Sequence, residues 1–265
     1  MATLTVGDQV VWYGTEGDPQ ASSAPVLLLP GTTMNRTGWD MVRAALPADA
    51  GLRFVLVELP GSGESAMPAG PLTVEGLADQ AAAVMAHLGH ERYHVAGYSL
   101  GAVAALGVAA RDAEHVITAT SLCGWALTDA RMRFTFDLWK RLIAISPELF
   151  MRYAVADGFT AGAIAALEPM LEDVISMGAA TIAPGSAAQL DLDSVVDISA
   201  MLESITAPTL IIGAEQDRWV DVSHSHDLAS KISGARLELL PAGHVVIQEL
   251  PGDVARLLHE HVSSK

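Results

Sequence analysis

The feature that most constrains the fold is a serine between two glycines, Gly97-Tyr98-Ser99-Leu100-Gly101. It follows the apolar run 93–96, which is typical of a buried strand, and precedes an Ala-rich stretch that is typical of a helix. A strand that turns at once into a helix needs glycines where side chains would collide. The pattern predicts a sharp turn that exposes the hydroxyl of Ser99 at the carboxyl end of the strand. The alternative role for Ser99 is that of a plain helix N-cap.

Short apolar runs alternate with helical stretches along the chain, which predicts a doubly wound, mostly parallel sheet of the α/β class. The expected strands cover residues 26–29, 54–59, 93–96, 117–122, 209–212 and 237–240. A helix is expected over 73–88, because Thr73 is a good N-cap and apolar residues recur at helical spacing behind it. Residues 3–6 and 9–12 flank Gly7-Asp8 and predict an antiparallel N-terminal hairpin.

Residues 126–188 interrupt this alternation, because they contain no convincing strand. We expect a core formed by residues 1–125 and 189–265, with 126–188 inserted as a helical cap. Helical runs are expected over 134–145, 147–155, 161–167 and 169–177. The insertion is rich in large apolar side chains, namely Phe134, Phe136, Trp139, Phe150, Met151, Phe159, Met170 and Met177. Each could simply pack the helices together, but as a group they predict an apolar roof over a pocket.

A serine hydroxyl is a weak nucleophile at neutral pH, so it needs a base and a group that orients the base. Asp217 and His244 each follow an expected strand, which places both in loops at the carboxyl edge of the sheet. The chain order serine, aspartate, histidine matches the order known for a strand-to-helix serine turn. Asp217 could instead be an ordinary loop carboxylate, with Glu215 or Asp221 as the acid.

The other histidines lack such support and are expected at the surface: His87, His90, His94, His115, His224, His226, His259 and His261. His224 and His226 are two residues apart, which does not place them on one helix face. No set of carboxylates or cysteines completes a tetrahedral shell around any of these histidines. We therefore predict no metal site.

Acyl transfer also requires donors that stabilise an oxyanion. The serine turn itself predicts one, the backbone N–H of Leu100. The second is expected in the loop Pro30-Gly31-Thr32-Thr33, where we assign the N–H of Thr32 with Thr33 as the near alternative; a plain glycine turn is the other interpretation. Trp125, Trp219 and Thr33 are the expected substrate contacts. The loop 59–65 is interpreted as a structural turn, because no Lys-Ser/Thr pair follows its glycines.

Composition limits the partners of this chain. Among 265 residues, the net charge of -16 disfavours nucleic acid and anionic membranes, so a small molecule is the expected partner and a homodimer stays open. The single cysteine, Cys123, cannot form an internal disulfide, and the first residues lack a basic and an apolar leader region. No apolar run approaches the roughly 20 residues that span a bilayer. A soluble, cytoplasmic protein without a cofactor is expected.

Several of these motifs together resemble the α/β-hydrolase fold over essentially the whole chain. They are Leu29-Pro30-Gly31-Thr32, Glu58 to Ser65, Gly97 to Gly101, Gly213 to Asp217, and Gly243-His244 with Glu249-Leu250-Pro251. The segment Gly31-Thr32-Thr33 with Trp39-Asp40 is similar to enol-lactone hydrolases, and the layout is similar to esterases, carbon–carbon bond hydrolases and polyketide-tailoring enzymes. Pro30 and Glu58 depart from the His and Asp of many members. Leu100 replaces the Met of cofactor-free haloperoxidases, which argues against a perhydrolase.

The resemblance implies a serine hydrolase that uses Ser99, Asp217 and His244 on a small, mostly apolar ester or lactone. Hydrolysis of a carbon–carbon bond in a diketone is the nearest variant. A fold does not fix a function, so two other classes stay open. One is a non-hydrolytic enzyme, a cofactor-independent dioxygenase or a cyclase, in which His244 and Asp217 act as the base. The other is a ligand-binding receptor with slow or no turnover.

Overall fold

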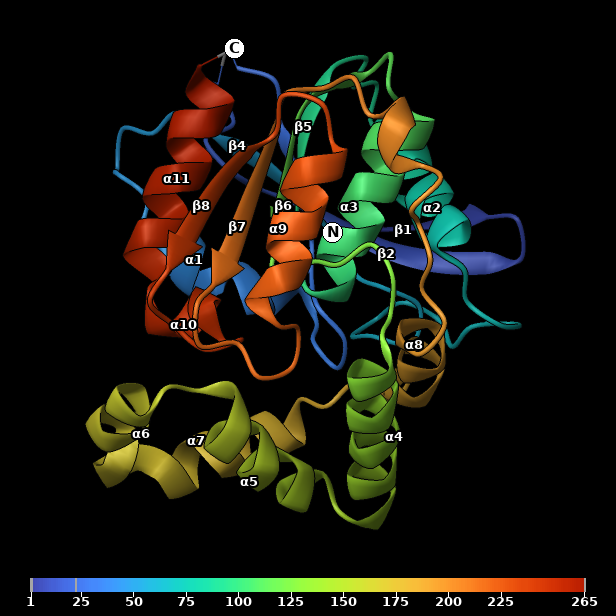
Figure 1. Ribbon diagram of the computed structural model, residues 1–265. Coiled ribbons are helices and arrows are strands. Elements are labelled where there is room, and N and C mark those ends of the chain that lie inside the picture. The colour runs from blue at the N-terminus through green and yellow to red at the C-terminus, as the bar shows by residue number, and fades with distance from the viewer. Residues whose placement is uncertain (1, 22, 265) are drawn as a thin grey trace.

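A computed structural model describes residues 2–21 and 23–264, and it contains an eight-stranded sheet of order β1-β2-β4-β3-β5-β6-β7-β8 (Figure 1). The strands are β1 (Ala2–Val6), β2 (Gln9–Gly17), β3 (Val26–Leu29), β4 (Arg53–Val57), β5 (Tyr93–Tyr98), β6 (Val116–Leu122), β7 (Thr209–Ala214) and β8 (Arg236–Leu240). Strands β3 to β8 pair in parallel, whereas β1 and β2 form an antiparallel hairpin that joins the sheet at β4. The predicted doubly wound, mostly parallel sheet is confirmed.

Helices cover both faces of the sheet. Because successive side chains of a strand point to opposite faces, each central strand contributes to two cores. Leu27 and Leu29 of β3 belong to the core under α2 (Val74–His87), α3 (Leu100–Arg111) and α9 (Val222–Lys231). Val26 and Leu28 belong to the other core, under α1 (Asp40–Ala44), α10 (Val246–Glu249) and α11 (Pro251–Ser263). The apolar runs of the sequence are therefore strands buried on both sides.

The inserted segment forms a separate helical layer beyond the carboxyl ends of the strands, where the arrowheads of β7 and β8 point in Figure 1. Its helices are α4 (Ala130–Ile145), α5 (Pro147–Gly158), α6 (Ala161–Leu167), α7 (Leu171–Ala180) and α8 (Ser186–Asp193). The two connections to the core lie side by side, because Leu127 and Asp197 form an antiparallel bridge. The predicted end of the cap at residue 188 falls inside α8, and the returning chain reaches the core at this bridge.

The structure corrects the expectation that all remaining histidines lie at the surface. His94 and His261 are buried, at 4% and 7% exposure. His94 lies on the central strand β5, and its Nδ1 is 2.8 Å from the hydroxyl of Thr118 on β6. Burial, with the charges of His261 and Arg92, lowers the pKa of His94 to about 4. His94 is therefore neutral in the folded protein at neutral pH.

This burial predicts a loss of stability in acid. Because folding lowers the pKa of His94 from the ordinary value of about 6.5, the unfolded chain binds more protons as pH falls from there towards the folded value of about 4. We expect His94 to remove about 2 to 3 kcal/mol from the free energy of unfolding over this interval. Urea titrations at pH 7 and pH 4 should show that the free energy of unfolding falls less for His94→Gln than for the wild type. The matched control His226→Gln, at an exposed position, should behave like the wild type.

None of the described helices is long and apolar enough to cross a membrane.

Candidate active site

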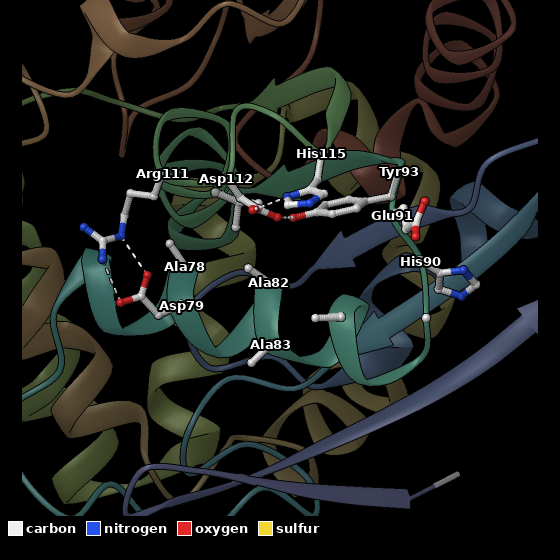
Figure 2. A pocket seen from close by; sticks show the side chains of 13 residues that line it. Ala78, Asp79, Ala82, Ala83, His90, Glu91, Tyr93, Arg111, Asp112 and His115 are labelled. Carbon is white, nitrogen blue, oxygen red and sulfur yellow. Dashed lines mark hydrogen bonds and ion pairs between the residues drawn. The ribbon is translucent and has the colours of Figure 1, made fainter.

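Two hollows lie at opposite edges of the sheet. The larger, about 560 Å³, lies beside the start of β5 and the ends of α2 and α3 (Figure 2). The smaller, about 450 Å³, lies between the carboxyl edge of the sheet and the cap. Ligand sites of open α/β sheets form at the carboxyl edge. The smaller hollow, here called the cap pocket, is therefore the candidate site.

The larger hollow contains polar groups that already bind one another. The guanidinium of Arg111 binds both carboxylate oxygens of Asp79, and the carboxylate of Asp112 binds Tyr93 and His115 (Figure 2). Burial and the hydrogen bond to Asp112 raise the pKa of Tyr93, so its hydroxyl stays protonated and donates to this carboxylate. Because these polar groups already pair with one another, we interpret the hollow as a structural groove between α2 and α3.

Ser99 lies in the predicted turn between β5 and α3. Its φ is 55° and ψ is -120°, a strained conformation for a residue with a side chain. The flanking glycines are required by close backbone contacts: a Cβ on Gly97 would lie 1.9 Å from the Gly101 oxygen, and one on Gly101 would lie 2.3 Å from the Leu29 oxygen. The side chain of Ser99 caps no backbone N–H of α3. The N-cap alternative is therefore wrong for this hydroxyl.

The structure brings Ser99, His244 and Asp217 together from three separate loops. The Oγ of Ser99 is 3.1 Å from Nε2 of His244, and Nδ1 of the same ring is 2.6 Å from Oδ2 of Asp217. All three residues are buried, with exposures of 8%, 2% and 6%. A proton can therefore pass from the serine to an imidazole whose other nitrogen donates to a carboxylate.

The carboxylate of Asp217 is fixed by further donors. Its Oδ1 accepts the backbone N–H groups of Trp219 and Val220 at 2.8 and 2.9 Å. The alternative acids have other places: Asp221 accepts the backbone N–H of Ser223 at the start of α9, and Glu215 is exposed.

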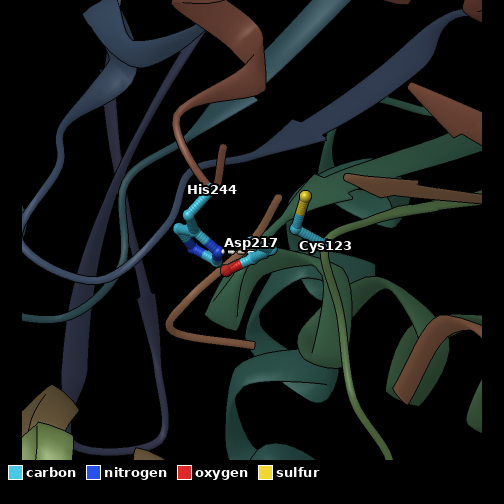
Figure 3. A group of neighbouring side chains, drawn as sticks. All are labelled: Cys123, Asp217 and His244. Atoms are coloured by element: carbon cyan, nitrogen blue, oxygen red, sulfur yellow. Dashed lines mark hydrogen bonds and ion pairs between the residues drawn. The ribbon is translucent and has the colours of Figure 1, made fainter. Parts of the chain in front are cut away.

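Cys123 completes the surroundings of this carboxylate. Ligand atoms of Cys123, Asp217 and His244 lie within 4.8 Å of one another, a spacing that a metal ion could also use (Figure 3). Burial, the charge of Asp217 and a hydrogen bond to it raise the pKa of the Cys123 thiol. With its pKa raised in this way, the thiol of Cys123 is protonated beside Asp217.

Two side chains that belong to the quoted motifs, but for which the sequence predicted no role, hold the loop of His244. The buried hydroxyl of Tyr98, next to Ser99, donates to the backbone oxygen of His244 at 3.0 Å. Glu249 accepts the backbone N–H of Gly243 at 2.9 Å, and its other oxygen accepts the hydroxyl of Thr160, between α5 and α6, at 2.6 Å. The cap is thus tied directly to the histidine loop.

The predicted oxyanion loop lies beside Ser99, since Thr32 and Thr33 both line the cap pocket. Within the described chain, the backbone N–H of Thr32 makes no hydrogen bond, whereas that of Thr33 donates to the side chain of Gln189 at 3.0 Å. Leu100 is the first residue of α3, so its N–H has no partner within the helix. The N–H groups of Thr32 and Leu100 are therefore the free donors, and Thr33 is the weaker candidate.

The wall of the cap pocket is neutral and mostly apolar. Its cap-derived lining contains Trp139, Phe150, Met151, Ala154, Phe159, Met170, Val174, Met177 and Ile182. None of its described lining residues is Asp, Glu, Lys or Arg. Phe134 is 74% exposed and does not line the pocket, and Phe136 lies in the core against Trp125 and Trp139. The remaining members of the predicted apolar roof do line the pocket.

The two tryptophans expected to touch the ligand have different positions. Trp219 lines the pocket, lies 4.9 Å from the ring of His244 and donates its indole N–H to Asp157 on α5 at 3.0 Å. Trp125 does not line the pocket; it is 0% exposed, and its indole N–H donates to Thr128. Because its ring packs under the cap, the structure gives no support to the expected contact between Trp125 and the ligand.

Known proteins resemble this chain in sequence and in fold. The model of the "Alpha/beta hydrolase family" matches residues 26–257. Pyrrolizixenacetamide deacetylase of Xenorhabdus hominickii is 28% identical, with 100% of this chain and 99% of that protein covered. A protein named carbamate hydrolase RutD in Azorhizobium caulinodans is also 28% identical, with 94% and 92% covered. The solved enol-lactonase of Burkholderia xenovorans has a TM-score of 0.86 at 20% identity, with 99% and 100% covered.

The family match covers most of the chain, and the fold likeness extends over nearly all of it. Both agree with the resemblance noted from the motifs around Ser99, Asp217 and His244. The chain belongs to the alpha/beta hydrolase family.

Proposed function

We propose that this protein is a serine hydrolase that cleaves neutral, mostly apolar carboxylic esters or lactones. The observation that carries the proposal is the hydrogen-bonded row Ser99, His244 and Asp217, of which Ser99 and His244 line a pocket without charged walls. Names of the relatives support the same reaction class, since they include a deacetylase, a carbamate hydrolase and an enol-lactonase.

In the proposed reaction, His244 accepts the proton of Ser99 as the oxygen attacks the substrate carbonyl carbon. Asp217 holds the ring in the tautomer that accepts at Nε2 and stabilises the imidazolium that forms. The N–H groups of Thr32 and Leu100 bind the oxyanion of the tetrahedral intermediate. His244 then donates the proton to the leaving oxygen. Water then attacks the carbonyl carbon of the acyl-serine while His244 accepts its proton. His244 returns this proton to the oxygen of Ser99 as the acid is released.

The neutral wall selects the substrate. A carboxylate or ammonium that leaves water for this pocket would find no oppositely charged side chain among the described lining residues, and burying an unpaired charge is costly. We therefore expect a neutral acyl ester to be hydrolysed with a kcat/KM at least about a hundredfold higher than an ester of equal length that ends in a carboxylate. Equal kcat/KM values for the two esters would contradict the proposed substrate class.

The cap pocket also predicts a preference for chain length. Met151 on α5 and Phe159 at the end of α5 line it, and each apolar side chain buried against a ligand contributes about 1.5 to 3 kcal/mol to burial. Across 4-nitrophenyl esters from acetate to decanoate, kcat/KM should rise until the pocket is filled. Met151→Ala and Phe159→Ala should move the optimum to a longer chain. Met41→Ala, at an exposed position on α1, is the matched control. An unchanged optimum in both cap variants would remove the cap from substrate selection.

A diketone in the same panel tests the carbon–carbon variant. The proposal expects the ester or lactone to be cleaved with the higher kcat/KM. If the diketone is preferred, the nucleophile stays the same and the substrate class changes.

A further inference from the structure

Helix α8, the last helix of the cap, holds the oxyanion loop by side chains. Gln189 is completely buried, and its Oε1 accepts the backbone N–H of Thr33, whose φ is 69°. Its Nε2 donates to the backbone oxygen of Pro60 and to the hydroxyl of Ser62. The positive φ of Thr33 is strained for a β-branched residue and persists only where neighbouring groups impose it. Gln189 is one of those groups.

A second side chain of α8, Asp193, reaches Thr32 itself. The Thr32 hydroxyl donates to Oδ2 of Asp193 at 2.6 Å. Asp193 is 0% exposed, and its Oδ1 has no hydrogen-bond partner among the described residues. A buried carboxylate with a bare oxygen is costly, whereas the protonated acid carries no charge. The carboxyl group therefore favours the neutral form.

The charges around Asp193 do not offset its burial. On α4, Arg133 donates to the backbone oxygen of Thr128, and Lys140 pairs with the exposed Asp191 of α8. Within the described chain, none of the ion pairs includes Asp193. Burial raises the pKa of Asp193 to about 8, and the hydrogen bond from Thr32 lowers it only in part.

We propose that Asp193 is a positioning residue that, as a neutral carboxylic acid, holds the oxyanion loop through the Thr32 hydroxyl. This inference rests on the hydrolysis proposed above, in which the N–H of Thr32 binds the oxyanion. Ionisation places a negative charge beside the residue that must stabilise a developing negative charge. The neutral acid therefore supports the reaction, and the carboxylate opposes it.

The inference predicts a fall of kcat in mild alkali. Ionisation follows the folded pKa of about 8, so kcat of the wild type should fall at least about tenfold between pH 7 and pH 9.5, with little change in KM. Asp193→Asn places an amide where the protonated acid lies and keeps an oxygen for Thr32. It should retain kcat at pH 7 and lose the alkaline fall. Asp191→Asn, two residues earlier on α8, is the matched control and should keep the wild-type profile.

Unfolding gives a readout that does not depend on catalysis. Because folding raises the pKa of Asp193, its contribution to stability is complete below the ordinary value of about 4 and is lost as pH rises through about 8. The difference in Tm between Asp193→Asn and the wild type should therefore grow in favour of the variant from pH 5 to pH 9. A constant difference would show that Asp193 does not bind its proton this tightly and would overturn the inference.

Variants of Thr32 test the same hydrogen bond if Asp193→Asn does not fold. Thr32→Val removes the hydroxyl and keeps the N–H, so kcat should fall about tenfold with KM little changed, and Thr32→Ser should restore it. Equal kcat for all three side chains would overturn the positioning role. These outcomes differ from a failure of the proposed function, because in that case the wild type would show no hydrolysis, or Ser99→Ala would retain it, whatever residue stands at position 193.

Discussion

Ser99→Ala should lower hydrolytic turnover by about three to six orders of magnitude and leave the fold intact. The hydroxyl has no capping bond to α3, and among the described residues its hydrogen-bond partner is His244. Its removal therefore deletes the attacking atom without a structural cost. His244→Ala should lose as much, and Asp217→Asn somewhat less. Initial rates on the preferred ester, with Tm as the test of folding, measure these effects.

Ser230→Ala, at an exposed position on α9, serves as the control and should keep full turnover. A Ser99→Ala protein that retained more than about a tenth of the wild-type rate would contradict acyl-serine chemistry. Loss of activity in the His244 variant alone would instead favour the base-catalysed dioxygenase or cyclase class. Tight ligand binding without product in the wild type would favour the receptor.

Thr32→Pro should lower turnover by about two to three orders of magnitude, because proline has no backbone N–H to offer the oxyanion. The change also removes the hydroxyl that binds Asp193. Thr32→Ala removes this hydroxyl and keeps the N–H, so the difference between the two variants isolates the backbone donor. Their kcat values, with unfolding measured in parallel, separate this effect from misfolding.

Equal losses in the proline and alanine variants would move the effect to the side chain. Thr33 is then no ready substitute, since its N–H is already bound by Gln189. A proline variant with wild-type kcat would remove Thr32 from the oxyanion site.

The sheet could be predicted closely because its strands are buried on both faces. The run Val26 to Leu29 coincides with β3, and the turns at Ser99, Asp217 and His244 follow from where β5, β7 and β8 end. In such strands the apolar run and the glycines that end it are local properties of the sequence. The candidate triad lies in these local features, which explains why its members could be named in advance.

The remaining features depend on contacts between distant segments. Trp125 is as large and apolar as Trp219, but only the folded chain shows that its indole meets Thr128 under the cap. Helix α8 is short and contains Gln189, Asp191 and Asp193, so its sequence resembles an exposed helix. The partner of Asp193 is 161 positions away, and no periodicity in the sequence reports such a contact.

The most direct test of the account is the intact mass of the protein after exposure to a fluorophosphonate. An activated serine attacks phosphorus, fluoride leaves, and the protein gains the mass of one phosphonyl group. We predict one adduct on the wild type, located at Ser99 by peptide mapping, and none on Ser99→Ala or His244→Ala under the same conditions. An unlabelled wild type, or a Ser99→Ala protein labelled to the same extent, would contradict the claim that Ser99 is the nucleophile.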